Sequence, residues 1–264
     1  MSSRTVRGRL YAGAVSGKVY AFANQKGGVG KTTTTVNLAA CLAEAGERAL
    51  VVDLDPQANA SSGLGMKANG TSSYDLLDGA AVGELAKPTA FPNLYCIPAK
   101  PELAGAAVEL SRRSDGEGYL AASLAGARDF SFVLLDCPPS LGPLTVNALA
   151  ASDRVIVPVQ AEYYALEGLA QLMRSINLIK ARLNARLAVG GVLITMSDTR
   201  TRLAADVERE VRRHFGNLVF ETVVPRSVRV AEAPSHGLPI THYDRRSRGA
   251  DAYWKVAMEL VERS

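Results

Sequence analysis

The chain has 264 residues, of which 47% are hydrophobic, and its formal net charge is +4 at pH 7. This length and apolar content are enough to bury the core of one α/β domain, and the mild positive charge permits an anionic partner without requiring one. The longest apolar runs, such as residues 155–159, have the length of a strand and are too short to cross a bilayer. The three cysteines, Cys41, Cys96 and Cys137, form no C-x-x-C pair, which argues against a disulfide framework and a zinc site.

Residues 1–17 precede the first apolar run and contain arginines but no continuous apolar segment. They predict a flexible tail rather than a secretory signal, and a cytoplasmic location follows as the default. No linker rich in Pro, Gly and Ser divides the remainder. We therefore expect residues 18–264 to form a single domain.

Residues 19–34, VYAFANQKGGVGKTTT, have the order of features that binds a phosphate group. The apolar residues 19–23 predict a buried strand, a glycine-rich turn follows, and a helix then runs to about Ala45, with Gly46 after its end. Glycines allow successive N–H groups to converge on an anion, Lys31 adds a charge for the β- and γ-phosphates, and the Thr32 hydroxyl suits Mg²⁺. We predict that a nucleotide is bound by Gly27, Gly28, Val29, Gly30, Lys31, Thr32 and Thr33.

Acidic residues close two further apolar runs. Residues 49–52 predict a strand that leads into Asp53 and Asp55, and residues 132–135 predict another that ends at Asp136. The carboxyl ends of parallel strands face the ligand crevice of a doubly wound sheet. Asp53 and Asp55 lie on the same side if the strand persists that far. Asp136 is then suited to hold Mg²⁺ through water.

The rest of the chain alternates between strand and helix patterns. Residues 58–70 are small and polar and predict a mobile loop. Strands are predicted at residues 93–97, 153–159 and 187–195, and helices at residues 74–77, 101–110, 119–127, 166–180, 202–213 and from about 249. This order predicts an α/β fold, with a single doubly wound, mostly parallel sheet and helices on both faces.

The motifs together resemble the ParA/MinD superfamily of P-loop ATPases. The glycine-rich loop KGGVGKTT has Gln25 where the usual pattern has glycine and carries an additional lysine, Lys26, which is typical of the superfamily's deviant Walker A box. The runs DLDPQ, DCPPS and PVQAEYYALEGL are similar to the short chromosomal ParA (Soj) branch, and the resemblance covers nearly all of residues 19–261.

The resemblance implies ATP and Mg²⁺ as cofactors and a homodimer that closes on ATP. Lys26 would reach the nucleotide of the partner subunit, and Asp55 would orient the attacking water. The implied catalytic residues are Lys26, Lys31 and Asp55, and the implied metal-binding residues are Thr32, Asp53 and Asp136.

The C-terminal runs VPRSVRVAEAPSHGLPI and YDRRSRGA are also similar to the Soj type. The resemblance implies that Arg200 and Arg229 lie on a non-specific DNA surface formed on dimerisation, and that the stretch containing Pro225 lies beside the adenine. On the residues alone, the helix at 202–213 is a solvated one with i,i+4 charge pairs, and His236 is a structural loop residue rather than a general acid or base.

The function implied by the resemblance is a slow ATPase switch for chromosome or plasmid segregation, associated with the nucleoid. It would bind DNA as the ATP dimer, and a ParB-like partner would stimulate hydrolysis. A MinD-like membrane switch would need a basic amphipathic C-terminal helix, and this C-terminus contains Glu259 and Glu262. An iron–sulfur carrier would need cysteines placed to bridge the dimer. Positioning of another cargo by the same chemistry stays open.

Overall fold

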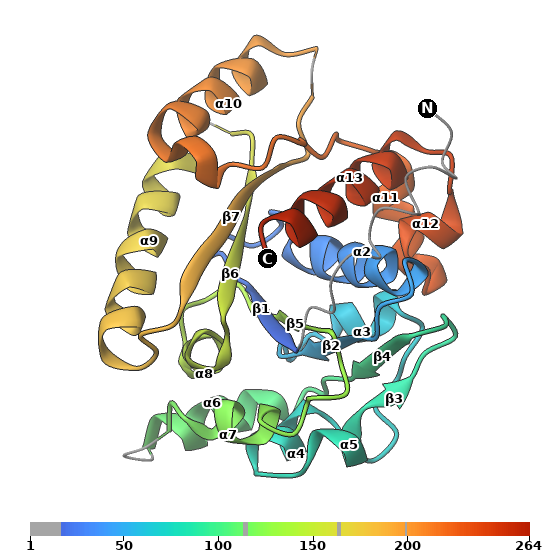
Figure 1. Ribbon diagram of the computed structural model, residues 1–264, viewed down its shortest axis with the longest axis vertical. Coiled ribbons are helices and arrows are strands. Elements are labelled where there is room, and N and C mark those ends of the chain that lie inside the picture. Colours follow the sequence, from blue (N-terminus) through green and yellow to red (C-terminus); the bar gives the residue numbers. More distant parts are fainter. Residues whose placement is uncertain (1–16, 113–115, 163–164, 199) are drawn as a thin grey trace.

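A computed structural model describes residues 17–112, 116–162, 165–198 and 200–264. Apart from Gly17, the predicted tail lies outside these residues. The described chain forms one seven-stranded sheet with the order β3-β4-β2-β5-β1-β6-β7 (Figure 1). All pairs of neighbouring strands are parallel except β3 with β4. The strands are β1 (Lys18–Phe22), β2 (Ala49–Asp53), β3 (Lys87–Pro88), β4 (Leu94–Ile97), β5 (Phe132–Asp136), β6 (Arg154–Gln160) and β7 (Ala188–Thr195).

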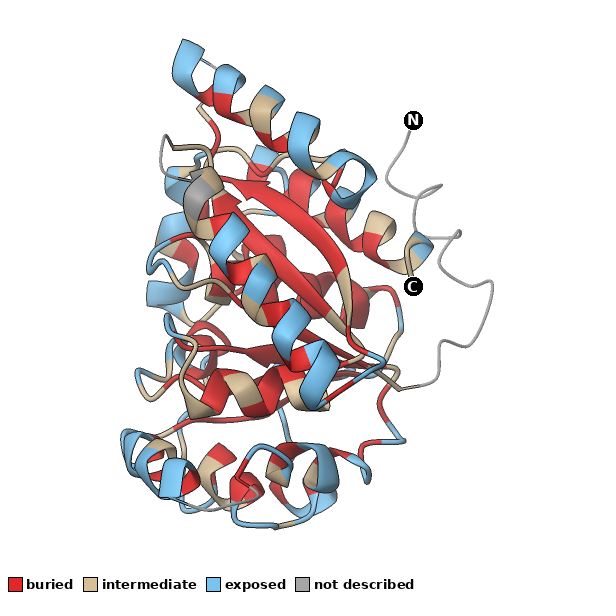
Figure 2. Ribbon diagram, turned by 90° about the vertical axis from the view of Figure 1, so that its left-hand side faces the viewer, coloured by how far each residue is buried: buried red, intermediate tan, exposed pale blue. Residues whose placement is uncertain are grey.

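The central strands β2 and β5 are buried along their whole length because both faces of the sheet are covered. In β2, Leu50 and Val52 belong to one core cluster, whereas Ala49 and Val51 belong to the other. This alternation follows from the period of two in a strand. Figure 2 shows the buried strands between helices whose exposed sides face outward.

The helices divide between the two faces. One face packs against α2 (Lys31–Glu44), α3 (Asn59–Gly63), α11 (Val228–Glu232), α12 (Ile240–Tyr243) and α13 (Arg248–Glu262). The other packs against α4 (Ser73–Leu77), α5 (Val82–Leu85), α6 (Leu103–Arg112), α7 (Tyr119–Leu124), α8 (Pro143–Ala151), α9 (Ala165–Arg182) and α10 (Arg202–Phe215). The predicted α/β class and doubly wound sheet are confirmed.

Helix α2 ends as its sequence predicts. Gly46 has φ +99°, its N–H donates to the Ala43 carbonyl at 3.0 Å, and the Glu47 N–H donates to the Leu42 carbonyl at 3.1 Å. This pair of bonds is a Schellman motif, for which glycine is the favoured residue because it has no Cβ.

Three predictions about elements were incomplete or wrong. Residues 58–70 are not a loop throughout, because α3 lies within them. Helix α8 and the short α5, α11 and α12 were not predicted. Pro101 precedes the first turn of α6 instead of lying in it.

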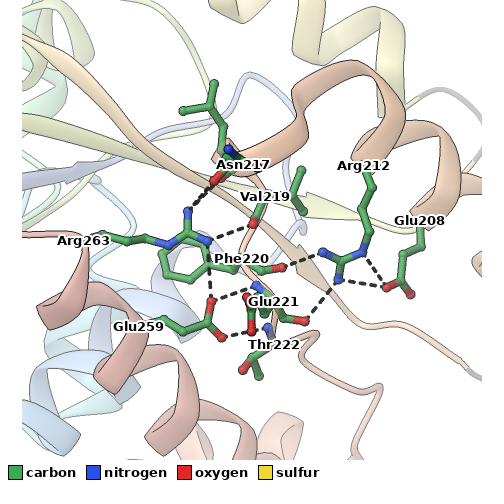
Figure 3. A network of polar contacts seen from close by, with 10 residues as sticks. Glu208, Arg212, Asn217, Val219, Phe220, Glu221, Thr222, Glu259 and Arg263 are labelled. Atoms are coloured by element: carbon green, nitrogen blue, oxygen red, sulfur yellow. Dashed lines mark hydrogen bonds and ion pairs between the residues drawn. The ribbon is translucent and has the colours of Figure 1, made fainter.

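A polar network fixes the segment that follows α10 (Figure 3). From α13, the Glu259 carboxylate accepts the N–H groups of Glu221 and Thr222 at 2.7 and 2.8 Å. Arg263 donates to the Val219 carbonyl at 2.9 Å, and Arg212 of α10 donates to the Phe220 and Glu221 carbonyls at 3.1 Å. The last helix and α10 therefore hold the start of the chain that continues to α11.

Among the described residues, no helix is both long and apolar enough to span a membrane.

Candidate functional site

A cavity of about 560 Å³ opens at the carboxyl ends of the strands. The glycine-rich loop after β1, Asp55 after β2, Pro139 after β5 and Met196 after β7 all contribute to its wall. Its full lining is Gly27, Gly28, Gly30, Lys31, Thr32, Thr33, Val36, Asn37, Asp55, Gln57, Asn59, Ser62, Gly63, Pro139, Met196, Pro234, Ser235 and Leu238. A crevice at this edge of an open α/β sheet is where such folds bind ligands.

The loop at the bottom of the cavity is shaped by two glycines and one threonine. Gly28 and Gly30 have φ +73° and +85°, a region that residues with a Cβ rarely adopt. The Thr195 hydroxyl at the end of β7 donates to the Val29 carbonyl at 2.8 Å. The N–H groups of the first turn of α2 have no acceptor within their helix. The positive end of the helix dipole at this N-terminus favours binding of an anion.

Lys31 is buried, with 6% of its surface exposed, although it lines the cavity. Its ammonium group donates to the Lys26 carbonyl at 3.1 Å. Burial lowers the pKa of Lys31, and the charges of Asp136, Cys137 and Asp55 partly oppose this effect. A desolvated ammonium group beside a cradle of N–H groups is suited to bind phosphate oxygens.

Thr32 and Asp136 lie in contact. The Thr32 hydroxyl donates to Asp136 Oδ2 at 2.7 Å, and the Thr35 hydroxyl donates to Asp136 Oδ1 at 3.2 Å. Burial, followed by the charge of Asp53, raises the pKa of Asp136 well above its ordinary value. No group of three or more His, Cys, Asp or Glu side chains forms a metal cluster within the described ranges. The hydroxyl and the buried carboxylate are nevertheless hard oxygen donors of the kind that Mg²⁺ prefers, and a cation beside them would offset the buried negative charge.

The two carboxylates after β2 separate into different environments. The strand ends at Asp53, so the expectation that Asp53 and Asp55 share one side of a strand does not apply. Asp53 is fully buried and accepts the Ser61 N–H and hydroxyl at 2.8 and 2.7 Å and the Asp55 N–H at 3.1 Å. Asp55 lines the cavity, whereas Asp53 does not.

Lys26 lies at the rim of the loop, and its side chain contacts Glu162. Its ammonium group forms an ion pair with Glu162 after β6, and the two side chains are 51% and 46% exposed. Asn24 holds the loop beneath it, accepting the Lys26 N–H at 3.0 Å. Within the described part of the chain, Lys26 is thus an accessible cation outside the cavity lining.

The arginines predicted to bind DNA lie on two adjoining segments. Ser197 and Pro225 form a parallel β-bridge, and the Arg226 N–H donates to the Ser197 carbonyl at 2.9 Å. Arg200 follows the first segment and Arg229 the second, and both are exposed. Pro225 lies at this bridge and outside the cavity lining, where Pro234 and Ser235 are found instead.

Several site residues gave no signal in the sequence. Ser61 and Glu162 contact predicted site residues, but neither occupies a motif position that assigns this contact. Asn37, one helical turn after Thr33, accepts the Ile240 N–H at 2.7 Å and so connects α2 to α12. Exposed His236 stacks on Tyr243, and the three cysteines are free and buried.

A family model described as "AAA domain" matches residues 17–189. The chain is 51% identical over 249 residues to the chromosome-partitioning ATPase Soj of Treponema pallidum, covering 94% of this chain and 98% of that protein. It is 49% identical over 254 residues to the chromosome partitioning protein ParA of Myxococcus xanthus, with coverages of 95% and 90%. It also resembles the solved structure of cobyrinic acid a,c-diamide synthase from Mycobacterium smegmatis with a bound ATP analog and magnesium, with 36% identity, a TM-score of 0.79, and coverages of 91% and 93%. The chain therefore belongs to the Soj/ParA family of chromosome-partitioning ATPases.

Proposed function

We propose that this protein is an ATP-dependent dimerising switch that binds DNA without sequence preference and drives DNA segregation with a ParB-like partner. One observation supports the proposal: the segments that carry the two arginines adjoin the wall of the cavity. Met196 lines the cavity and immediately precedes Ser197, which is bridged to Pro225. A change in backbone conformation at Met196 can therefore alter the positions of Arg200 and Arg229, because only a few residues separate them from this bridge.

The glycine-rich loop and Lys31 would hold the phosphates of ATP. Thr32 would bind Mg²⁺ directly and Asp136 through water, as their contact and their oxygen chemistry favour. The bound Mg²⁺ would neutralise charge on the phosphate oxygens. We expected Asp53 to support the metal. Its two oxygens instead accept the N–H groups of Ser61 and Asp55, so Asp53 would hold the segment that carries Asp55.

Asp55 is the residue on the cavity wall suited to orient a water molecule. Its Oδ1 accepts the Gln57 N–H at 3.0 Å, which fixes the direction of the carboxylate. Its backbone is held in turn by Asp53. Positioning of the attacking water accounts for much of the protein's contribution to phosphoryl transfer. We propose a slow basal ATPase whose rate a partner raises.

Dimer formation would bring Lys26 of each subunit to the phosphates of the other. It would also place the arginines of both subunits on one surface. Each phosphate contact adds to affinity without reading the base sequence, so doubling the contacts deepens binding steeply. Loss of the γ-phosphate would then release both the dimer and the DNA.

The proposal is tested by DNA retention in the presence of ATP, ADP or no nucleotide, at several salt concentrations. We expect retention with ATP alone, weakening steeply as salt rises. Lys31→Ala should lose ATP binding and with it DNA retention, whereas Arg229→Glu should keep the ATP-dependent dimer and lose DNA. Retention that ignores the nucleotide would overturn the switch, and the ATPase would then serve another cargo.

A further inference from the structure

Both arginines assigned to DNA already bind carboxylates of their own chain. Arg200 donates from Nε to Asp198 Oδ1 at 2.8 Å and from Nη2 to Oδ2 at 2.6 Å. Arg229 donates from Nη1 to Glu232 Oε2 at 3.1 Å, and its Nε lies 3.8 Å from Asp244 Oδ2. The two arginine side chains are 86% and 59% exposed. Each is therefore accessible to a ligand but has its N–H groups directed at an acid.

The Arg200 contact has the geometry of phosphate recognition. Two parallel N–H···O bonds to one carboxylate use the same fork of donors that binds two oxygens of a phosphate. A DNA phosphate must therefore displace Asp198 before it gains these bonds. Asp198 is charged throughout the neutral range, because the hydrogen bonds from Arg200 lower its pKa to about 2.

Both acids make further hydrogen bonds within the chain. Asp198 Oδ1 also accepts the Arg200 N–H at 3.1 Å, and the Asp198 carbonyl accepts the Thr201 N–H at 3.0 Å. Glu232 accepts the Tyr243 hydroxyl at 3.2 Å. Each carboxylate is thus held where its arginine meets it.

We propose that Asp198 and Glu232 are intramolecular competitors of DNA phosphate at Arg200 and Arg229, and that they keep the DNA affinity of a single subunit low. The inference rests on the proposed function. It extends the proposed function by naming residues that set the difference in DNA affinity between the single subunit and the ATP dimer. Asp244 adds a third negative charge, near Arg229. A surface that combines the arginines of both subunits would make enough phosphate contacts to overcome this competition.

The test uses Asp198→Asn and Glu232→Gln, measured as affinity for a duplex without nucleotide and with ATP. Asparagine keeps an oxygen for the Arg200 N–H, and glutamine keeps one for the Tyr243 hydroxyl. The variants therefore remove the negative charge that competes with phosphate, while one neutral acceptor stays beside each arginine. Exposed ion pairs are weak, so we expect each variant to bind DNA roughly two- to fivefold more tightly without nucleotide. The double variant should gain more and should narrow the ratio between ATP-bound and nucleotide-free affinity.

The matched control is Asp206→Asn on α10. It removes the same charge from an exposed aspartate that is paired with Arg209 at 3.2 Å. A gain in Asp198→Asn and Glu232→Gln that exceeds the control supports the inference, and equal gains overturn it, because net charge alone would then explain them. If wild-type protein shows no ATP-dependent DNA retention, the proposed function itself fails, which is a separate result from the comparison among variants.

Discussion

Asp53 and Asp136 are register partners at the ends of β2 and β5, and both are fully buried. Burial raises the pKa of both carboxyls; the charge of Asp53 adds to the effect at Asp136, and the charge of Asp55 adds to it at Asp53. Their contacts nevertheless separate their roles. Asp136 contacts Thr32, whereas Asp53 binds Ser61 in the middle of the short helix α3. The pair therefore connects the floor of the cavity to the segment that carries Asp55.

This arrangement predicts that stability depends on pH in the absence of magnesium. Burial is the largest cause that raises the pKa of Asp53 from 3.8 to about 6. The folded state therefore keeps a proton that the unfolded state has lost, and stability falls as pH rises from about 4 to about 6. One pKa unit corresponds to about 1.4 kcal/mol, so roughly 3 kcal/mol is at stake. Urea unfolding between pH 4 and 7 measures this slope.

Asp53→Asn should reduce the slope, and below about pH 4 it should lower stability, because one amide oxygen cannot accept from both Ser61 and the Asp55 N–H. Ser61→Ala is the opposing control. Its hydroxyl lowers the pKa of Asp53 by donating to the carboxylate, so its removal should extend the fall in stability to higher pH. An Asp53→Asn protein with the wild-type slope would show that Asp53 does not carry the effect.

At the residue scale, the sequence predicted the groups that belong to a local motif. Lys31 and Thr32 occupy fixed positions after a strand and a glycine-rich turn, so their place at the cavity follows from the chain itself. The role of Asp53 as an anchor could not be predicted in this way. Its partner Ser61 is eight residues away, in a segment whose composition indicates a loop.

At the scale of elements, the six parallel strands were predictable because apolar runs of four to eight residues between turn signals are distinctive. The two-residue strand β3 was not predicted. Helix α8 was missed because its sequence, PLTVNALAA, is almost wholly apolar and has no period of 3.6. Helix α3 has five residues, and its fold depends on a carboxylate from β2. Tertiary contacts, rather than local propensity, form such elements.

The contact between α13 and the segment after α10 gives a prediction at this scale. Glu259→Ala leaves two backbone N–H groups, those of Glu221 and Thr222, without their acceptor. We expect a loss of about 2 kcal/mol in the free energy of unfolding, since bonds to charged acceptors are stronger than the average. Thermal unfolding measures the loss, with Glu262→Ala, an exposed glutamate of the same helix, as the control. Equal midpoints for the two variants would contradict the role assigned to the network in Figure 3.

At the scale of the whole molecule, the sheet places the cavity, Lys26 and the arginine segments at the edge formed by the carboxyl ends of the strands. α13 buries Tyr253, Val256, Ala257 and Leu260 in the core. The apolar face of this helix is therefore occupied, which argues against its use as a membrane-binding helix of the MinD-like kind. The rim of the cavity, with exposed Lys26, Gly27 and Gly28, is open to a nucleotide-dependent partner.

Lys26 is the residue at this rim whose contact must change when two subunits close. It pairs with Glu162 in the single chain, and the proposed dimer requires it at the partner's nucleotide. Lys26→Ala should therefore bind ATP but fail to dimerise, as measured by sedimentation velocity with a non-hydrolysable ATP analogue. Glu162→Gln should strengthen dimerisation. It releases Lys26 from an exposed ion pair, so the dimer should form at roughly two- to fivefold lower protein concentration. A Lys26→Ala protein that dimerises like the wild type would remove Lys26 from the interface, and Glu162 would then be an ordinary surface partner.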